Sequence, residues 1–517
     1  MSRMQLKHLS AGFMALFLCG LSSLYPRTLF ADHLIQTEKH YYLFSERTGD
    51  LLKIGTGGCP ATGQIETNSP PLIGFSLPDG DPLQERFNHL SYGIEKEEKT
   101  GTHHTLVFLS SPLTPGLSFK KTYRIGKKNH FVDVSLSLLG PESASFSNNT
   151  ALTVVLNPVD GWDLSAATGS SEERRMVFVG ERESLTESEF RKRPSPTLAQ
   201  GEWAGFRDRF SAVLIKPDIP LTAMDETLPD RSAPPRLTFK TLSALTTVSM
   251  RLYTGPVDWF SFGEEKKTLS FLLYDALWFW VRWISFGLFF LLYGLIQISG
   301  SHGLSILLLS LAVKGMMLPL VRVSDQWQND VNKKRSLIEP REKEIKSRYK
   351  GHEQHQRILA LYKELDIHPM YALKTFLSCF IQIPIFFAAY HALSENVWLK
   401  GVSFLWITDL TRPDHFYRLP VDLFYFGGYV NLLPLLMTAI TVVTAALFQD
   451  PILSEAQLKK QKMNLYLMAA AFFLLFYPFP AGMVLYWTMN NLLALIKELV
   501  RKIFGRGRLI TSVGEVS

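Results

Sequence analysis

Apolar residues are distributed unevenly along this chain. Residues 33–265 alternate between short apolar and polar positions and are interrupted by turn residues, whereas residues 266–505 contain long apolar runs. An alternation with a period of two is typical of half-buried strands, and uninterrupted apolar runs of ~20 residues are typical of helices that cross a bilayer. The pattern therefore predicts a multi-domain membrane protein, with an all-β domain followed by an α-helical membrane domain.

The first region is predicted to fold as a β-sandwich. Strand-like segments at 118–125 and 131–138 are separated from their neighbours by clusters of Gly, Pro, Asn and Asp, as at 55–61 and 77–83. Many short strands at such spacing are typical of sandwiches. The acidic pairs of this region are interpreted as solvated loops, and no catalytic set stands out. Binding of a carbohydrate, of an extended peptide or of no ligand all stay open.

The N-terminal segment, residues 1–31, has the pattern of an export signal. Arg3 and Lys7 precede an apolar stretch from residue 9 to residue 24, and small residues end at Ala31. A cleaved signal peptide and a retained signal anchor both fit this pattern, and we favour retention. With either alternative, the region that follows is expected to be exported.

Five apolar runs in the second region are each close to the ~20 residues needed to cross a bilayer. They cover residues 304–321, 372–392, 430–448, 463–479 and 481–499. A further stretch, 269–298, carries Asp275 and Arg282 among Trp and Phe residues. It is either one more span or a helix that lies in the membrane interface. We favour the interface, where aromatic side chains gather.

The distribution of positive charge predicts the topology of these spans. The loop 322–371 carries 11 Lys and Arg residues, whereas the loop 394–429 carries three. Because cytoplasmic loops are enriched in Lys and Arg, the first loop and the C-terminus are expected in the cytoplasm. With residues 33–265 exported, five spans in the core 299–505 satisfy this placement, and a sixth span at 269–298 would invert it.

The cytoplasmic segment 323–366 is predicted to form an antiparallel helical hairpin. Val331, Ile338 and Ile345 recur every seven residues, Leu361 lies in the stripe of the return helix, and Gly351 marks the turn. A solvated connector and a docking element both fit this pattern. The length of the segment favours a docking or capping role.

Charge and cysteine content exclude several classes of function. The net charge is +7, but the cations cluster between and after the apolar runs and no basic run with interleaved aromatics occurs in the soluble half, which argues against a nucleic-acid partner. The three cysteines have no spacing typical of a metal site or of a disulfide framework. No metal, cofactor or catalytic residue is predicted.

Lys314 is the candidate functional residue, because it lies inside the first apolar run of the core. A cation costs at least ~2.5–3.5 kcal/mol at the centre of a bilayer. Ser310 lies one turn earlier on the same helix face. In the other four runs the only Asp or Glu is Glu498, at the end of the last run, and none lies deeper within them. Lys314 could therefore face a wet cavity, or it could extend its ammonium to the cytoplasmic surface, and both alternatives stay open.

Several motifs together resemble the YidC/Oxa/Alb family of membrane insertases, in the form with a large periplasmic domain. They are Lys314-Gly315-Met-Met-Leu-Pro319, Ile338-Glu-Pro340, residues 360–364 with Pro369, 381–386 with Gln382 and Pro384, 405–410 with Trp406, and 479–487 with Pro480, Gly482, Tyr486, Trp487 and then Asn490. Segments 116–123, 203–210 and 252–256 resemble the family's exported β-supersandwich more loosely.

The resemblance implies an inner-membrane insertase and foldase that is not an enzyme and acts on newly made membrane proteins. The Sec translocon, the ribosome and the lipid bilayer are the other candidate partners. The resemblance also implies that Lys314 is the cation of a hydrophilic groove and that the remaining motif residues are structural. The residues expected to line the groove or contact substrate are Ser310, Gln382, Tyr486, Trp487 and Asn490. Lysine stands where the family usually has arginine, and a glycine pair common after Pro369 is missing. A secondary transporter and a membrane-anchored carbohydrate-active enzyme are the alternatives.

Overall fold

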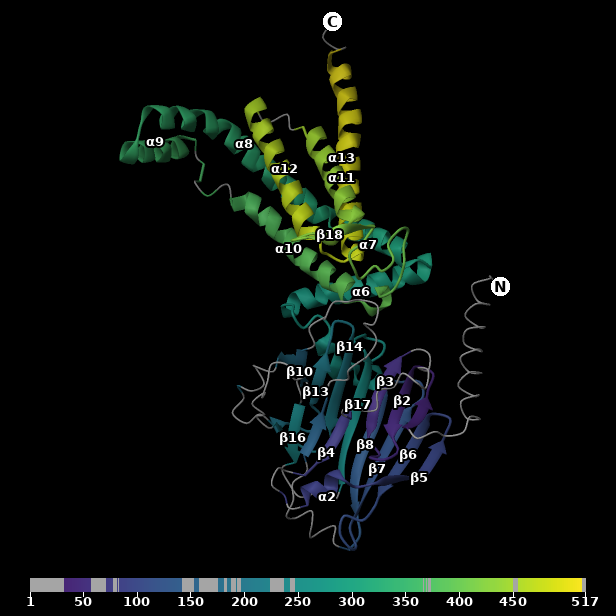
Figure 1. The fold of residues 1–517 in the computed structure, drawn as a ribbon. Helices are drawn as coiled ribbons and strands as arrows, with labels where there is room; N and C mark the ends of the chain where they lie inside the picture. The colour runs from purple at the N-terminus through teal and green to yellow at the C-terminus, as the bar shows by residue number, and fades with distance from the viewer. Residues whose placement is uncertain are drawn as a thin grey trace, which may run out of the picture. The chain divides into compact units, whose positions relative to one another are not determined.

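The computed structural model describes residues 32–56, 71–77, 81, 83–141, 153–157, 175–180, 184–186, 192, 197–223, 237–241, 247–365, 367–368, 370, 373–449 and 454–513. The predictions for residues 1–31 and for Pro369 lie outside these residues. The chain divides into two compact units, Met1–Leu273 and Tyr274–Ser517, which are described separately. The first is built of β-sheets and the second is mainly helical, as the hydropathy pattern predicts (Figure 1).

Antiparallel sheets make up the first unit. A nine-stranded sheet runs in the order β11 (Ser184–Thr186), β10 (Arg175–Val179), β13 (Trp203–Arg207), β14 (Ser211–Pro217), β17 (Thr247–Pro256), β8 (Phe131–Leu139), β7 (Ser118–Gly126), β6 (His103–Ser110) and β5 (Tyr92–Lys99). A five-stranded sheet contains β12 (Thr197–Leu198), β15 (Leu221–Ala223), β16 (Leu237–Thr241), β9 (Thr153–Leu156) and β4 (Ile73–Ser76). A three-stranded sheet contains β1 (Asp32–Gln36), β2 (His40–Ser45) and β3 (Leu51–Thr56). The short helices are α2 (Gln84–Asn88), η1 (Gly263–Glu265), α5 (Lys266–Leu269) and η2 (Ser270–Leu272).

One apolar core joins the three sheets. Phe44 of β2, Phe119 of β7 and Phe239 of β16 are fully buried members of the same cluster. Along β8 the even-numbered residues from Val132 to Leu138 are buried, whereas Asp133 and its odd-numbered neighbours are partly exposed. Because side chains alternate across a strand, the sheet at β8 presents one apolar face to the core and one polar face outward, whereas β13 and most of β14 are buried on both faces.

A pair of buried histidines connects β2 to the start of β8. The rings of His40 and His130 approach to 2.6 Å between Nε2 and Nδ1, and both side chains are buried. Burial lowers the pKa of His40 to about 4 and the pKa of His130 to about 3, because desolvation penalises the charged imidazolium. Both rings are therefore neutral in the folded protein at neutral pH.

The histidine pair predicts acid sensitivity of the first unit. The unfolded chain binds a proton at each site near pH 6.5 and the folded chain binds it only near pH 3–4, so folding stability falls as the pH drops below 6.5. Between pH 7 and pH 5 the expected loss is about 2 kcal/mol for each histidine. Urea unfolding followed by fluorescence should show this loss in the wild type and in the control His103→Gln, which replaces a partly exposed histidine. A His40→Gln/His130→Gln variant that keeps the full loss would contradict the assignment.

Helices make up most of the second unit. They are α6 (Phe279–Ser299), α7 (His302–Met316), α8 (Leu318–Arg348), α9 (Gly351–Glu364), α10 (Leu373–Ser394), η3 (Val397–Leu399), α11 (Leu432–Leu447), α12 (Glu455–Phe476) and α13 (Ala481–Val513). The two-stranded hairpin β18 (Tyr417–Leu423) and β19 (Gly427–Val430) precedes α11. Helix α13 packs against α11 and α7, and α10 packs against α6 and α8. Helices α7, α10, α11, α12 and α13 occupy the five predicted apolar runs.

Among the described helices, α6 is by length and composition able to cross a membrane as one straight helix. Helices α7 and α8 are long and apolar enough to cross a membrane only when taken together, and this pair is bent by 59°. Helix α11 is apolar but shorter. The helix α6 begins at Phe279, so the first part of the predicted interfacial stretch, residues 269–278, forms the end of α5, the short helix η2 and a turn instead. The five-span count and the interfacial placement of residues 269–298 stay predictions.

The bend between α7 and α8 has a local cause. Helix α7 ends and α8 begins at Met317, and Pro319 lies in the first turn of α8. Proline has no backbone N–H to donate to the preceding turn, which makes it compatible with the start of a helix but not with its interior. Pro319 therefore favours a new helix here.

Helices α8 and α9 form the predicted hairpin, with α9 folded back along α8 (Figure 1). Ile338 and Leu361 are buried in a small apolar cluster with Ile367. The turn places Gly351 at a φ of +64°, a left-handed conformation that glycine adopts without strain. Pro340 lies inside α8 and is exposed.

Candidate functional site

Lys314 lies in the last turn of α7 and is half-buried. Within the described residues, no hydrogen bond or ion pair joins its ammonium to a neighbour. Asp325 of α8 acts on Lys314 electrostatically, but its carboxylate pairs with Lys497 of α13 at 3.0 Å, and both members of that pair are exposed. The described surroundings therefore leave the cation of Lys314 without its own carboxylate.

Ser310 joins α7 to α13. Its hydroxyl donates a hydrogen bond to the backbone carbonyl of Tyr486 at 2.8 Å, and the Asn490 amide donates to the same carbonyl at 3.2 Å. Ser310 and Tyr486 are both buried. Small polar residues of this kind let membrane helices approach closely and bond to one another. In this arrangement the Ser310 side chain and the Tyr486 backbone belong to a helix–helix contact, and the contact of either residue with a substrate stays a prediction.

The other predicted contact residues keep part of their surface open. Gln382 of α10 is exposed, and Asn490 is partly exposed. Trp487 is half-buried, with its ring 5.3 Å from Phe386 of α10 and 5.4 Å from Phe476 of α12. These three residues are therefore the ones that a bound segment could reach without separating α7 from α13.

A buried carboxylate that the sequence reasoning missed caps α11. Asp414 accepts hydrogen bonds through one oxygen from the backbone N–H groups of Leu432 at 2.8 Å and Leu433 at 2.9 Å. The same oxygen accepts the indole N–H of Trp406 at 3.1 Å. A carboxylate at a helix N-terminus satisfies free backbone donors and complements the helix dipole. Trp406 is thus one of the three donors to this carboxylate, and its assignment as a structural residue stays a prediction.

The start of α13 is fixed to the same loop. The backbone N–H of Ala481 donates to the carbonyl of Arg412, and that of Gly482 donates to the carbonyl of Leu410 at 2.8 Å. A Cβ atom at Gly482 would lie 3.0 Å from the Leu410 oxygen, closer than ordinary packing allows. Pro480, which precedes the helix, is buried.

Two motif residues have less evident roles. A Cβ atom at Gly315 would meet no atom within 4 Å, so nothing in the described residues explains a glycine there. Pro384 lies inside α10 and is half-buried.

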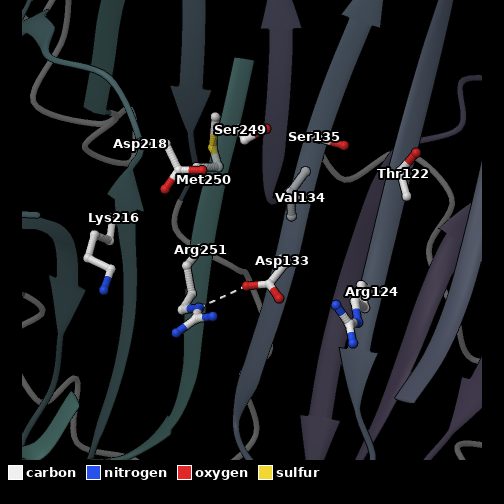
Figure 2. A pocket seen from close by; sticks show the side chains of 10 residues that line it. All are labelled: Thr122, Arg124, Asp133, Val134, Ser135, Lys216, Asp218, Ser249, Met250 and Arg251. Atoms are coloured by element: carbon white, nitrogen blue, oxygen red, sulfur yellow. Dashed lines mark hydrogen bonds and ion pairs between the residues drawn. The ribbon is translucent and has the colours of Figure 1, made fainter. Parts of the chain in front are cut away.

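The polar face of the nine-stranded sheet holds a cavity of about 520 Å³ (Figure 2). Across neighbouring strands, Arg124 pairs in register with Asp133, Asp133 with Arg251, and Arg251 with Lys216. The Asp133 carboxylate accepts a hydrogen bond from Arg251 at 2.8 Å. An acid–base pair of carboxylates for glycoside chemistry would need two such groups free to act. The cavity holds two carboxylates, Asp133 and Asp218, and the first of them is bonded to Arg251.

Comparisons with known proteins place the second unit in a family. The profile of the 60Kd inner membrane protein family matches residues 294–505. A membrane protein insertase YidC of Syntrophobacter fumaroxidans is 32% identical over 254 residues, 48% of this chain and 42% of that protein. One of Pelobacter propionicus is 26% identical over 456 residues, 86% of this chain and 78% of that protein.

A crystal structure of an active YidC insertase with its first transmembrane domain resolved covers 91% of this chain and 92% of its own, at 18% identity and a TM-score of 0.36. The chain spans less than half the length of the Syntrophobacter protein. The profile match and the long Pelobacter alignment agree on one assignment. Residues 294–505 belong to the family of the 60Kd inner membrane protein, and the relatives that the chain matches are named membrane protein insertase YidC.

Proposed function

We propose that this protein inserts newly made proteins into the inner membrane, and that Lys314 attracts the acidic, hydrophilic flank of an incoming segment. The observation that carries this proposal is the half-buried ammonium of Lys314, which has no carboxylate of its own among the described residues. A buried charge without a partner is costly, so an acidic group on a substrate would be stabilised next to it. The groove would thereby lower the cost of moving a polar flank into the bilayer.

A lysine at this position sets the selectivity of the attraction. An ammonium is a compact point charge, whereas a guanidinium binds a carboxylate through two parallel hydrogen bonds. Lys314 is therefore expected to recognise negative charge with little preference for its orientation. Such tolerance suits a protein whose substrates share charge and hydropathy but not sequence.

Gln382, Trp487 and Asn490 would meet the segment beside the cation. They lie on α10 and α13, and their partly open surfaces offer one amide, one indole and a second amide. The apolar part of the substrate would then follow the exposed apolar side chains of α10 and α12, of which Phe387 and Leu467 are examples. Ser310 and Tyr486 would hold the back of this site together.

The α8–α9 hairpin is the proposed cytoplasmic docking element, with the Sec translocon and the ribosome as candidate partners. Its outer surface is rich in exposed charge, including Arg341 and Arg348. Both arginines pair with glutamates of the hairpin, so the surface is mixed in sign rather than uniformly basic. In this topology residues 33–265 are periplasmic and the C-terminus is cytoplasmic.

The test is insertion by the purified chain in liposomes. A single-span substrate with a short acidic tail should become protected from external protease in vesicles that contain the chain, and remain digested in empty vesicles. The same vesicles should not accumulate small solutes faster than empty ones. Solute accumulation without protection of the substrate would contradict the proposal and support the secondary transporter.

A further inference from the structure

The β18–β19 hairpin carries an apolar surface that no other part of the second unit covers among the described residues. Its exposed apolar side chains are Phe416, Tyr417, Val421, Leu423, Phe424 and Tyr425. Phe424, at the tip, has a relative exposure of 108%. We propose that this surface, the aromatic hairpin of residues 416–430, lies in the headgroup–acyl boundary of the periplasmic leaflet of the bilayer.

Water is a poor environment for the aromatic hairpin. Residues 423–426 read Leu-Phe-Tyr-Phe, and Arg418 and Asp422 are the only charged residues between 416 and 430. An isolated two-stranded hairpin is marginally stable in water, and an exposed apolar strand edge promotes aggregation. A contiguous apolar surface of this kind marks a contact with a membrane or a partner.

Contacts with α12 fix the hairpin beside a predicted membrane span. The Tyr425 hydroxyl donates to the backbone carbonyl of Leu474 at 2.6 Å. The ring of Phe426 lies 4.7 Å from that of Tyr477, whose hydroxyl donates to the carbonyl of Tyr429 at 2.7 Å. Leu474 is itself exposed. The apolar surface of the hairpin therefore continues the exposed apolar side of α12, which favours lipid over a separate protein as its occupant.

The unpaired backbone groups of the hairpin determine how deep it can lie in the bilayer. A two-stranded hairpin leaves open edges with unpaired N–H and C=O groups, which the hydrocarbon core does not tolerate. The headgroup region supplies water and polar groups for these edges, and tyrosines such as Tyr417 and Tyr425 concentrate there. Arg418 and Asp422 can also reach headgroups from this level. The interface is thus the depth that suits both the apolar side chains and the backbone.

The direction of α12 across the membrane indicates which leaflet contains the hairpin. Lys459, Lys460 and Lys462 lie near its start, and the hairpin contacts its last turns. Because positive residues mark the cytoplasmic end of a span, the hairpin belongs at the periplasmic end. This step rests on the proposed topology and does not depend on insertase activity.

The test is a depth measurement on the full chain in vesicles of phosphatidylethanolamine and phosphatidylglycerol. In a background with Cys19, Cys59 and Cys379 replaced by serine, a nitroxide label is placed at Phe424→Cys. Matched labels at Leu467→Cys, on the exposed side of α12, and at Lys96→Cys, on the exposed strand β5, serve as lipid and water references. Because all three side chains are exposed, labelling should leave the fold intact.

The label at position 424 should be relaxed by oxygen more than the label at 96, and by a water-soluble nickel chelate at least about fivefold less, as expected for a label removed from water. Its depth should be shallower than that at position 467. Nickel accessibility equal to that at position 96 would overturn the proposal. Protection from both oxygen and nickel would also overturn it, since it would show burial against protein.

Discussion

A Lys314→Glu variant should insert single-span substrates with acidic exported tails at least about tenfold more slowly than the wild type, which corresponds to about 1.4 kcal/mol. The substitution replaces an attraction between the groove and the tail by a repulsion. The repulsion is strong at this site because a half-buried pair is less screened than an exposed one. The rate is measured as protease protection of the substrate over time, at matched amounts of variant and wild type in the vesicles.

Two controls separate this charge effect from a general loss of function. Lys314→Arg keeps the positive charge and should insert the same substrate at a rate within about twofold of the wild type, a difference below 1 kcal/mol. Lys128→Glu reverses an exposed charge in the turn before β8 and should have no effect. Insertion by Lys314→Glu at the wild-type rate would exclude a role for the charge.

An Asp414→Ala variant should unfold at a lower temperature than the wild type by roughly 6–12 °C, equivalent to about 3 kcal/mol. The substitution leaves three donors without their acceptor, the N–H groups of Leu432 and Leu433 and the indole of Trp406. Loss of a helix cap and burial of unpaired donors both destabilise the folded state. The midpoint is measured on the full chain in detergent.

Two control variants test the effect of burial and the effect of charge separately. Asp325→Ala removes an exposed carboxylate paired with Lys497 and should change stability by less than about 1 kcal/mol. Asp414→Asn keeps an acceptor oxygen and should fall between the alanine variant and the wild type. An alanine variant that melts with the wild type would show that the cap does not stabilise α11.

Local patterns predict the classes of structure well. The alternation at 131–138 became β8 because one face of the sheet meets the core and the other does not. The apolar runs are mostly helical, although the run 304–321 is divided between α7 and α8, and Ile338 and Leu361 meet in the α8–α9 hairpin. These features depend on residues close together in sequence, so a single chain is sufficient to predict them.

Features that depend on distant residues escaped prediction. Asp414 caps a helix that begins 18 residues later, and no short motif links the two positions. Helical spacing places Ser310 on the face of Lys314, but spacing alone does not tell whether that face meets water, lipid or α13. The aromatic hairpin was missed because Pro420 interrupts its strand pattern, and the pairing shifts register between Arg418 and Leu423. The Gly427-Gly428 pair at the start of β19 was the available signal.

Because residues 410–414 bond to the first turns of both α11 and α13, these two helices are fastened to each other at one end. Farther along, the Asn491 amide donates to the Thr441 hydroxyl at 3.0 Å and joins the same two helices again. Helices α11 and α13 are therefore held together over several turns, and we expect them to move as one body when a neighbouring helix shifts.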